Sequence, residues 1–171
     1  KINSILPADI SVNGFNKVQG EANARFGAIS KEYIYKIHQN KNPFLNNRSL
    51  FYKRTINIQL MNEACKVLVA SSDFQSFSKV KTEVNNFKCV INYARFEKSN
   101  DNFNFIISSN RFLRGMVRCI VGTLLKVSEK KISLEKFNKI VENKDRKGAG
   151  PSVLASGLYL SKVEYPSNIY I

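Results

Sequence analysis

The stretch that most constrains the fold is residues 105–127, FIISSNRFLRGMVRCIVGTLLKV. It begins like the end of a strand, breaks at three polar residues (108–110), and continues with a helical pattern from Phe112. Two neighbouring rows of apolar residues then recur every four positions: Phe112, Met116, Ile120 and Leu124, with Leu113, Val117, Val121 and Leu125 beside them. So wide an apolar face predicts a helix inside the hydrophobic core.

Three arginines follow the remaining edge of this predicted helix. Arg111, Arg114 and Arg118 are three and four positions apart, so a helix would align them on one side. Gly115 and Gly122 lie near the same edge, where another backbone or a ligand can approach closely. A guanidinium group at the border of a core is costly unless an anionic group meets it. Arg118 therefore forms a structural ion pair with a local acid or meets a buried carboxylate that no sequence neighbour supplies.

The charge of the chain favours a polyanionic partner. There are 27 Lys and Arg against 13 Asp and Glu, a formal net charge of +14 over 171 residues. Nucleic acid is the first candidate. An anionic membrane surface is the second, but the sequence contains no basic amphipathic helix with exposed aromatic residues. No signal peptide is visible, and no apolar run approaches the roughly twenty residues that span a membrane, so we expect a cytoplasmic protein.

The cysteines and the single histidine predict no metal site or catalytic cluster. Cys65, Cys89 and Cys119 are far apart in apolar surroundings, which indicates buried thiols in a reducing compartment rather than zinc ligands or disulfides. His38 precedes a polar loop, so we expect it at the surface. The sequence has no P-loop, nucleophile elbow or zinc-protease motif and no carboxylate pair at a useful spacing. These absences argue against a self-sufficient hydrolase.

The remaining patterns predict one domain, residues 1–171. The expected strands are 25–38, 84–97, 103–108 and 157–165, and the expected helices are 57–70, 112–127 and 134–143. A turn at 99–102 makes the second and third strands a hairpin, and Ser133 is the expected N-cap of the last helix. The sum is an α+β fold, a largely antiparallel sheet with helices packed on one face. The chain starts at Lys1 without a methionine, and we expect an upstream part to be missing.

Tyr33 is a second candidate for function. It lies mid-strand among basic residues, in the segment KEYIYK. A planar ring beside cations is suited to stacking on a base displaced from an RNA helix, an interaction worth roughly 1–3 kcal/mol per base. The alternative is a core tyrosine in an amphipathic strand, and the pattern by itself favours that alternative.

Several motifs together resemble the tRNA pseudouridine synthase A family. Residues 23–37, NARFGAISKEYIYKI, are similar to its ARF-x-A-x-x-[RK]-x-Y-x-Y segment, and residues 111–127 are similar to its FL-x-x-MVR-x-IVGTLL-x-V helix. Shorter matches extend from near the first residue to near the last: LPADI at 6–10, KDR at 144–146, AGP at 149–151, GLYL at 157–160 and VEYP at 163–166. Because the MVR-x-IVGTLL run is highly specific, the chain is identified as a member of this family.

The resemblance implies an RNA-modifying isomerase that converts uridine to pseudouridine at positions 38 to 40 of the tRNA anticodon stem-loop. It implies no metal and no organic cofactor, and a homodimer whose two subunits jointly hold one tRNA. By the same resemblance, Arg118 pairs with the nucleophilic aspartate, Tyr33 stacks on the target base and Leu158 packs against the site. The further candidate substrate contacts are Arg25, Arg111 and Arg114.

The nucleophile of the family has no counterpart in this sequence. In the family it lies in an upstream G-R-T-D-x-G-V-H-A segment, whereas Asp9 here belongs to the LP-x-DI motif and Asp145 to KDR. We therefore expect the C-terminal part of the enzyme, which supplies tRNA binding, base stacking and the arginine, and which is inactive alone. The alternative is a non-catalytic basic RNA-binding module, which predicts tight, salt-dependent RNA binding without the upstream half. The aromatic signature of sheet-platform modules is absent, which argues against it.

Overall fold

A computed structural model of the chain describes residues 1–79, 86–100 and 102–171. Within these residues the helices are α1 (Ile58–Ala70), α2 (Met116–Ser128) and α3 (Leu134–Glu142). The strands are β1 (Ser30–His38), β2 (Leu50–Phe51), β3 (Ile91–Ser99), β4 (Asn102–Ser109) and β5 (Leu158–Glu164). Single-turn 3₁₀ helices lie at Ile2–Ser4, Pro43–Leu45, Gln75–Phe77, Ala155–Gly157 and Ser167–Ile169.

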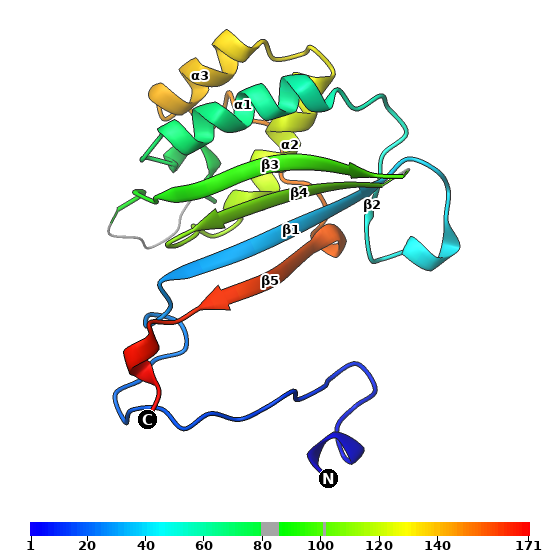
Figure 1. The fold of residues 1–171 in the computed structure, drawn as a ribbon. Helices are drawn as coiled ribbons and strands as arrows, with labels where there is room; N and C mark the ends of the chain where they lie inside the picture. The colour runs from blue at the N-terminus through cyan, green and yellow to red at the C-terminus, as the bar shows by residue number, and fades with distance from the viewer. Residues whose placement is uncertain (80–85, 101) are drawn as a thin grey trace.

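Strand β1 is the centre of the sheet. One of its edges pairs antiparallel with β4, which in turn pairs antiparallel with β3. Its other edge is shared by β5, antiparallel along residues 30–35, and by the short strand β2, parallel at residues 37 and 38. Figure 1 shows the three helices gathered on one face of this sheet. The predicted α+β fold with a largely antiparallel sheet is confirmed.

The predicted core helix is the most buried helix of the fold. In α2, Met116, Ile120 and Leu124 are fully buried, as the four-residue repeat indicated. Helices α1 and α2 pack on the sheet, and α3 packs against both of them. The core therefore lies between the helical layer and the face of β1 that carries Tyr35 and Ile37, both fully buried.

The start of this helix differs from the prediction. Helix α2 begins at Met116 rather than Phe112, because its N-cap Gly115 has a left-handed backbone with φ 76°. Arg111 and Arg114 consequently lie in the segment before the helix, and the expected row of three arginines along one helix edge is wrong. Gly115 makes no close contact, since a Cβ built there would lie 3.9 Å from its nearest neighbour.

The strand boundaries also differ at their N-terminal ends. Strand β1 begins at Ser30 rather than residue 25, because the side chain of Asn23 accepts hydrogen bonds from the backbone amides of residues 25 and 26 and folds them into a turn. Strand β3 begins at Ile91, and residues 84 and 85 of the predicted strand lie outside the described part. The β3–β4 hairpin is confirmed, with Ser99 opposite Asn102, while Asp101 of its turn is likewise outside the described residues.

The other two predicted helices are confirmed to within one residue. Helix α1 has Asn57 as its N-cap, and the side chain of Asn57 accepts a hydrogen bond from the backbone amide of Leu60 at 3.0 Å. Helix α3 has the expected N-cap Ser133, whose Oγ accepts from the amide of Lys136 at 3.1 Å. Both caps satisfy amides that the first helical turn leaves free.

His38 is buried, so its predicted surface position is wrong. Only 4% of the residue is exposed. Phe51 of β2 pairs directly opposite it, and the two rings stack with centroids 5.3 Å apart. A two-residue strand is too short to show alternation in the sequence, so the pairing that covers His38 was not predictable from periodicity.

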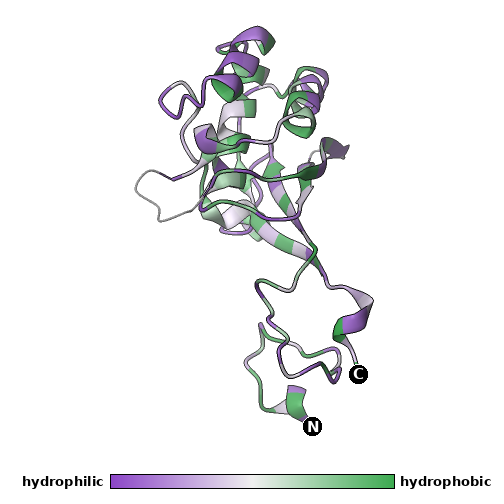
Figure 2. Ribbon diagram, turned by 90° about the vertical axis from the view of Figure 1, so that its left-hand side faces the viewer, coloured by the Kyte–Doolittle hydropathy of each residue, from purple (hydrophilic) through white to green (hydrophobic). Residues whose placement is uncertain are grey.

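Residues 1–29 and the tail after β5 form an arm that extends away from the helical layer (Figure 2). Within the arm the C-terminal tail pairs with residues 18 and 19, because the backbone amide of Gln19 donates to the carbonyl of Ile169 at 3.0 Å and Val18 bridges to Tyr170. Large apolar side chains on the arm are exposed: Ile5 by 82%, Phe15 by 75% and Phe26 by 78%. The arm is therefore an apolar surface outside the core.

Candidate functional site

Arg118 lies in the first turn of α2 and is half-buried. Its Nε donates to the backbone carbonyl of Val153 at 2.6 Å, and its own carbonyl accepts from the amide of Val153 at 3.2 Å. None of the ion pairs among the described residues includes Arg118. Glu83 and Asp101 are outside that set. The guanidinium is thus neither free in bulk water nor paired with an acid of the described chain.

Tyr35 lies beside Arg118 and was not predicted as a site residue. It is fully buried, and its hydroxyl donates to the backbone carbonyl of Leu154 at 2.7 Å. Burial raises the pKa of Tyr35 to about 12, and the positive charge of Arg118 opposes that rise, which indicates how close the two groups are. The signal that could have identified it is the second tyrosine of the Y-x-Y motif, which shares a strand face with Tyr33.

Tyr33 and Leu158 lie on the same face of the sheet as Tyr35. Tyr33 is half-buried, and its ring meets that of Phe112 edge to face, with centroids 5.0 Å apart and planes at 90°. Leu158 of β5 pairs directly opposite Tyr35 and packs against the core. The structure therefore brings three of the predicted site residues, Tyr33, Arg118 and Leu158, to one face around Tyr35.

The other predicted arginines are not part of this cluster of side chains. Arg111 is half-buried and donates from Nη1 to Oδ1 of Asn86 at 3.2 Å, and Arg114 is exposed. Both lie in the segment that leads into α2. Arg25 is exposed in the turn before β1, with its guanidinium 5.1 Å from the ring centroid of Phe26. All three remain at the surface, where a polyanion can reach them.

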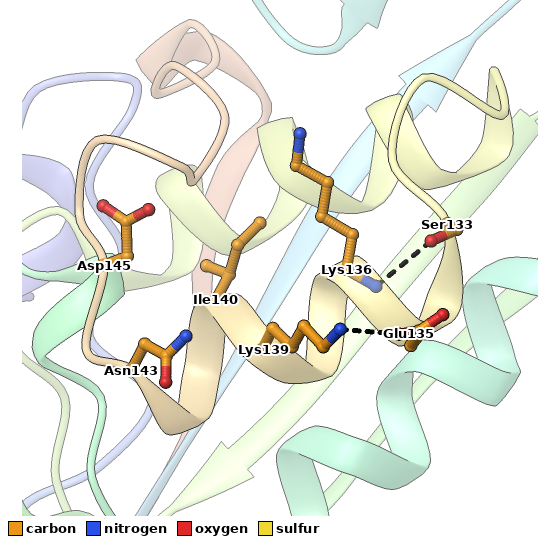
Figure 3. A pocket seen from close by; sticks show the side chains of 7 residues that line it. All are labelled: Ser133, Glu135, Lys136, Lys139, Ile140, Asn143 and Asp145. Atoms are coloured by element: carbon orange, nitrogen blue, oxygen red, sulfur yellow. Dashed lines mark hydrogen bonds and ion pairs between the residues drawn. The ribbon is translucent and has the colours of Figure 1, made fainter.

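A surface pocket of about 390 Å³ lies along α3 and carries none of the predicted site residues. Lys139 and Glu135 form an ion pair of 2.6 Å at its wall, and the amide of Lys136 donates to Ser133 (Figure 3). The pocket is lined by Ser133, Glu135, Lys136, Lys139, Ile140, Asn143 and Asp145. Its charges of both signs are the ordinary pattern of a solvated helix face.

Comparison with known proteins decides the family. A family profile described as tRNA pseudouridine synthase matches residues 64–166. The tRNA pseudouridine synthase A of Parabacteroides distasonis is 43% identical over 172 residues, which cover 99% of this chain and 68% of the relative. The chain belongs to the tRNA pseudouridine synthase family. The enzymes of the same name from Porphyromonas gingivalis and Staphylococcus carnosus are 40% and 33% identical, over 100% and 95% of this chain and 69% and 61% of their own lengths.

The similarity to tRNA pseudouridine synthases covers the whole cluster around Tyr35. The profile match includes Arg118, Val153 and Leu158 but begins after β1. The similarity to the Porphyromonas gingivalis enzyme extends over the full chain and so includes Tyr33 and Tyr35. This chain spans about two thirds of the length of these relatives.

The cysteines of this tRNA pseudouridine synthase chain are buried free thiols, as expected. Burial raises the pKa of the Cys65 thiol to about 12. In the part of the chain that the structure describes, no three His, Cys, Asp or Glu side chains come together as ligands for a metal ion. No described helix is long and apolar enough to cross a membrane.

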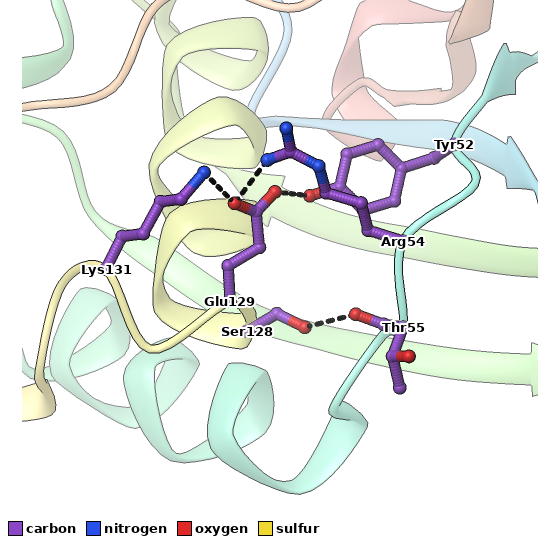
Figure 4. A network of polar contacts seen from close by, with 6 residues as sticks. All are labelled: Tyr52, Arg54, Thr55, Ser128, Glu129 and Lys131. Atoms are coloured by element: carbon purple, nitrogen blue, oxygen red, sulfur yellow. Dashed lines mark hydrogen bonds and ion pairs between the residues drawn. The ribbon is translucent and has the colours of Figure 1, made fainter.

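The C-terminal end of α2 is fixed to the loop before α1 by Glu129 (Figure 4). One carboxylate oxygen of Glu129 accepts from Arg54 and Lys131, each at 2.5 Å, and the other accepts from the hydroxyl of Tyr52. The hydrogen bond from Arg54, with those from Lys131 and Tyr52, lowers the pKa of Glu129 to about 2. The carboxyl is therefore ionised at neutral pH and joins segments far apart in the sequence.

Replacing Glu129 with glutamine is expected to lower the free energy of unfolding by about 1 kcal/mol at pH 7. A carboxyl whose folded pKa lies below its unfolded value stabilises the fold above pH 4.5, and this contribution is lost as the pH falls towards 2. Urea denaturation of the wild type and of Glu129→Gln at several pH values should show that the difference between their free energies of unfolding becomes smaller as the pH falls over that range. The exposed Glu63→Gln variant is the control, and a difference independent of pH would contradict the assignment.

Proposed function

We propose that residues 1–171 form the RNA-binding and base-stacking part of a tRNA pseudouridine synthase that isomerises uridine at positions 38 to 40 of the anticodon stem-loop. In this proposal Arg118 pairs with the nucleophilic aspartate, and that aspartate comes from a part of the enzyme outside these residues. The reaction breaks the bond from the sugar to N1 of uracil and makes one to C5, so C5 releases its proton and N1 takes up a proton. No metal or organic cofactor has a role in it.

The geometry of Arg118 is the observation that carries the proposal. Its Nε is occupied by Val153, and no acid of the described residues pairs with it. A half-buried guanidinium in that state can bind a carboxylate through its two Nη groups. Its charge would keep the carboxylate ionised and aimed at the sugar or base. The exposed apolar side chains of the arm support the proposal, because such a surface is typical of contact with another part of an enzyme.

Tyr33 is proposed to stack on the target base, with Leu158 packed beside the site. The Tyr33 hydroxyl makes no hydrogen bond with the described residues, and the ring is only half-buried, so both features leave room for a substrate base. Arg25, Arg111 and Arg114 are proposed to contact the tRNA backbone, in keeping with the net charge of +14. The intact enzyme is proposed to be a homodimer that holds one tRNA with both subunits.

Tritium release from tRNA labelled at C5 of uridine tests the proposal. The protein expressed from its complete reading frame should release tritium, and residues 1–171 alone should not. Substrates with cytidine in place of uridine at positions 38, 39 and 40 should release none from the anticodon arm. Turnover by residues 1–171 alone would overturn the proposal that the aspartate comes from outside these residues. No turnover by the complete protein would overturn the enzymatic function and favour an RNA-binding module.

Replacing Tyr33 with leucine in the complete protein is expected to lower kcat/KM about 10- to 100-fold, which corresponds to losing roughly 1–3 kcal/mol of base stacking. Leucine retains apolar contact with Phe112 but has no planar face. Tyr33→Phe, which keeps the ring, should lose far less activity. Steady-state tritium release measures both variants, and Tyr93→Leu on the opposite face of the sheet is the control. If Tyr33→Leu were stable and fully active, Tyr33 would be a core residue only.

A further inference from the structure

Residues 151–157, which we call the crossing segment, lie between α3 and β5 in the sequence. They make contact with both α2 and β1 next to Arg118. At α2, the carbonyl of Pro151 approaches Gly122 so closely that a Cβ there would lie 1.9 Å from its oxygen. One turn earlier, Val153 exchanges two hydrogen bonds with Arg118. At β1, the hydroxyl of Tyr35 donates to the carbonyl of Leu154. The crossing segment is thus bound to both elements through consecutive residues.

We propose that Tyr35 is a positioning residue for Arg118, which it orients through the crossing segment without touching the substrate. The Tyr35 hydroxyl holds the carbonyl of Leu154, and this fixes the preceding peptide, whose carbonyl accepts the Nε–H of Arg118. The inference rests on the proposed role of Arg118 as the partner of the nucleophile.

The hydrogen bond at Nε has a geometric consequence for the rest of the guanidinium. The group is planar, so fixing Nε–H on Val153 also fixes the direction of both Nη groups. Those groups are the ones available to a carboxylate, because the described residues give them no partner. If the carbonyl of Val153 moved, the guanidinium could rotate at the end of the Arg118 side chain, and its Nη groups would point elsewhere. A misplacement of about 1 Å in a reacting group can lower a rate about 100-fold.

The hydroxyl of Tyr35, rather than its ring, is the group that carries this role. The ring is fully buried and packs against Gly157, where a Cβ would lie 2.9 Å from Cζ of Tyr35. A phenylalanine would fill the same space in the core. The pKa of Tyr35, raised to about 12 by burial, keeps the hydroxyl a donor throughout the neutral range. A purely packing role would therefore be preserved in Tyr35→Phe, whereas the positioning role would not.

Kinetics of the protein expressed from its complete reading frame give the first test. Tyr35→Phe is expected to lower kcat about 10- to 100-fold while KM for tRNA stays within about twofold, because a buried hydroxyl cannot contact the substrate. Tyr159→Phe is the matched control. Its hydroxyl also donates to a backbone carbonyl at 2.7 Å, that of Arg48, but it lies on the opposite face of the sheet. It should keep the wild-type kcat.

Nitrogen-15 NMR of the Arg118 Nε–H gives a second test that does not depend on activity. The resonance is assigned by its absence in Arg118→Lys. The hydrogen on Nε should exchange slowly with solvent in the wild type and in Tyr159→Phe, and rapidly in Tyr35→Phe. Ala155→Gly, an exposed change that loosens the crossing segment without altering the core, should also speed the exchange and lower kcat. Faster exchange in Tyr35→Phe supports the positioning role even if the wild type forms no pseudouridine. Unchanged exchange, or an unchanged kcat in an active enzyme, overturns it.

Discussion

Replacing Arg118 with lysine is expected to lower kcat for pseudouridine formation about 10²- to 10³-fold, the usual cost of losing one group that stabilises charge at a reacting centre. The charge is kept, and arginine and lysine have similar helix propensities, so α2 should still form. What is lost is the planar fork, which can bond Val153 through Nε and a carboxylate through both Nη groups at the same time. A lysine ammonium is a point charge and cannot hold both partners in fixed directions.

Single-turnover tritium release from C5-labelled tRNA measures this effect, together with the affinity for tRNA. Affinity should change little, because the loss concerns the orientation of the nucleophile. Arg95→Lys is the matched control, since Arg95 is on the other face of the sheet and pairs with Glu97 at 2.6 Å. Equal rates for Arg118→Lys and wild type would show that Arg118 is a structural residue only. Loss of activity on replacing Glu83 or Asp101 would instead point to a carboxylate within this chain.

Much of the fold was predictable because its core elements are long and periodic. The apolar rows of α2 and the pattern of β1 each extend over eight or more residues, so their placement in the core was predictable. The errors fall where a local backbone conformation, a local hydrogen bond or the pairing of a distant strand overrides the pattern. Helix α2 begins later in the sequence than predicted because Gly115 has a left-handed backbone, and β1 begins later because of the hydrogen bonds to the Asn23 side chain. His38 is buried because β2 pairs beside it. Periodicity contains no information about any of these.

The site was predictable only in part. Resemblance to the family placed Tyr33, Arg118 and Leu158, and the structure brings these three residues to one face. Apart from the Y-x-Y motif, sequence patterns did not single out Tyr35 or Val153. The Tyr35 hydroxyl donates to a backbone carbonyl, that of Leu154, and Val153 contacts Arg118 through its own backbone, and almost any residue can present a carbonyl. The same reasoning explains why Gly122 was recognised as a close-approach position while its partner, the carbonyl of Pro151, was not.

Replacing Gly122 with alanine is expected to lower the free energy of unfolding by about 3 kcal/mol or more. The new Cβ would lie 1.9 Å from the carbonyl oxygen of Pro151 and 3.1 Å from its carbonyl carbon, so backbone would have to move. The opposing chain has little freedom, because the amide of Gly150 donates to Oγ1 of Thr123 at 2.9 Å. For a chain of this size the melting temperature should fall by about 6–12 °C.

Two other glycines separate this steric effect from the general cost of replacing glycine. Gly14 has no atom within 4 Å of a built Cβ, so Gly14→Ala should change stability by less than about 0.5 kcal/mol. Gly115 has space but a left-handed backbone, so Gly115→Ala should cost about 1 kcal/mol from strain. Urea denaturation should rank Gly122→Ala as the most destabilised, then Gly115→Ala, then Gly14→Ala. If Gly122→Ala lost no more stability than Gly115→Ala, the backbone of Pro151 would be able to move away from α2. The crossing segment would then be too loosely held to orient Arg118.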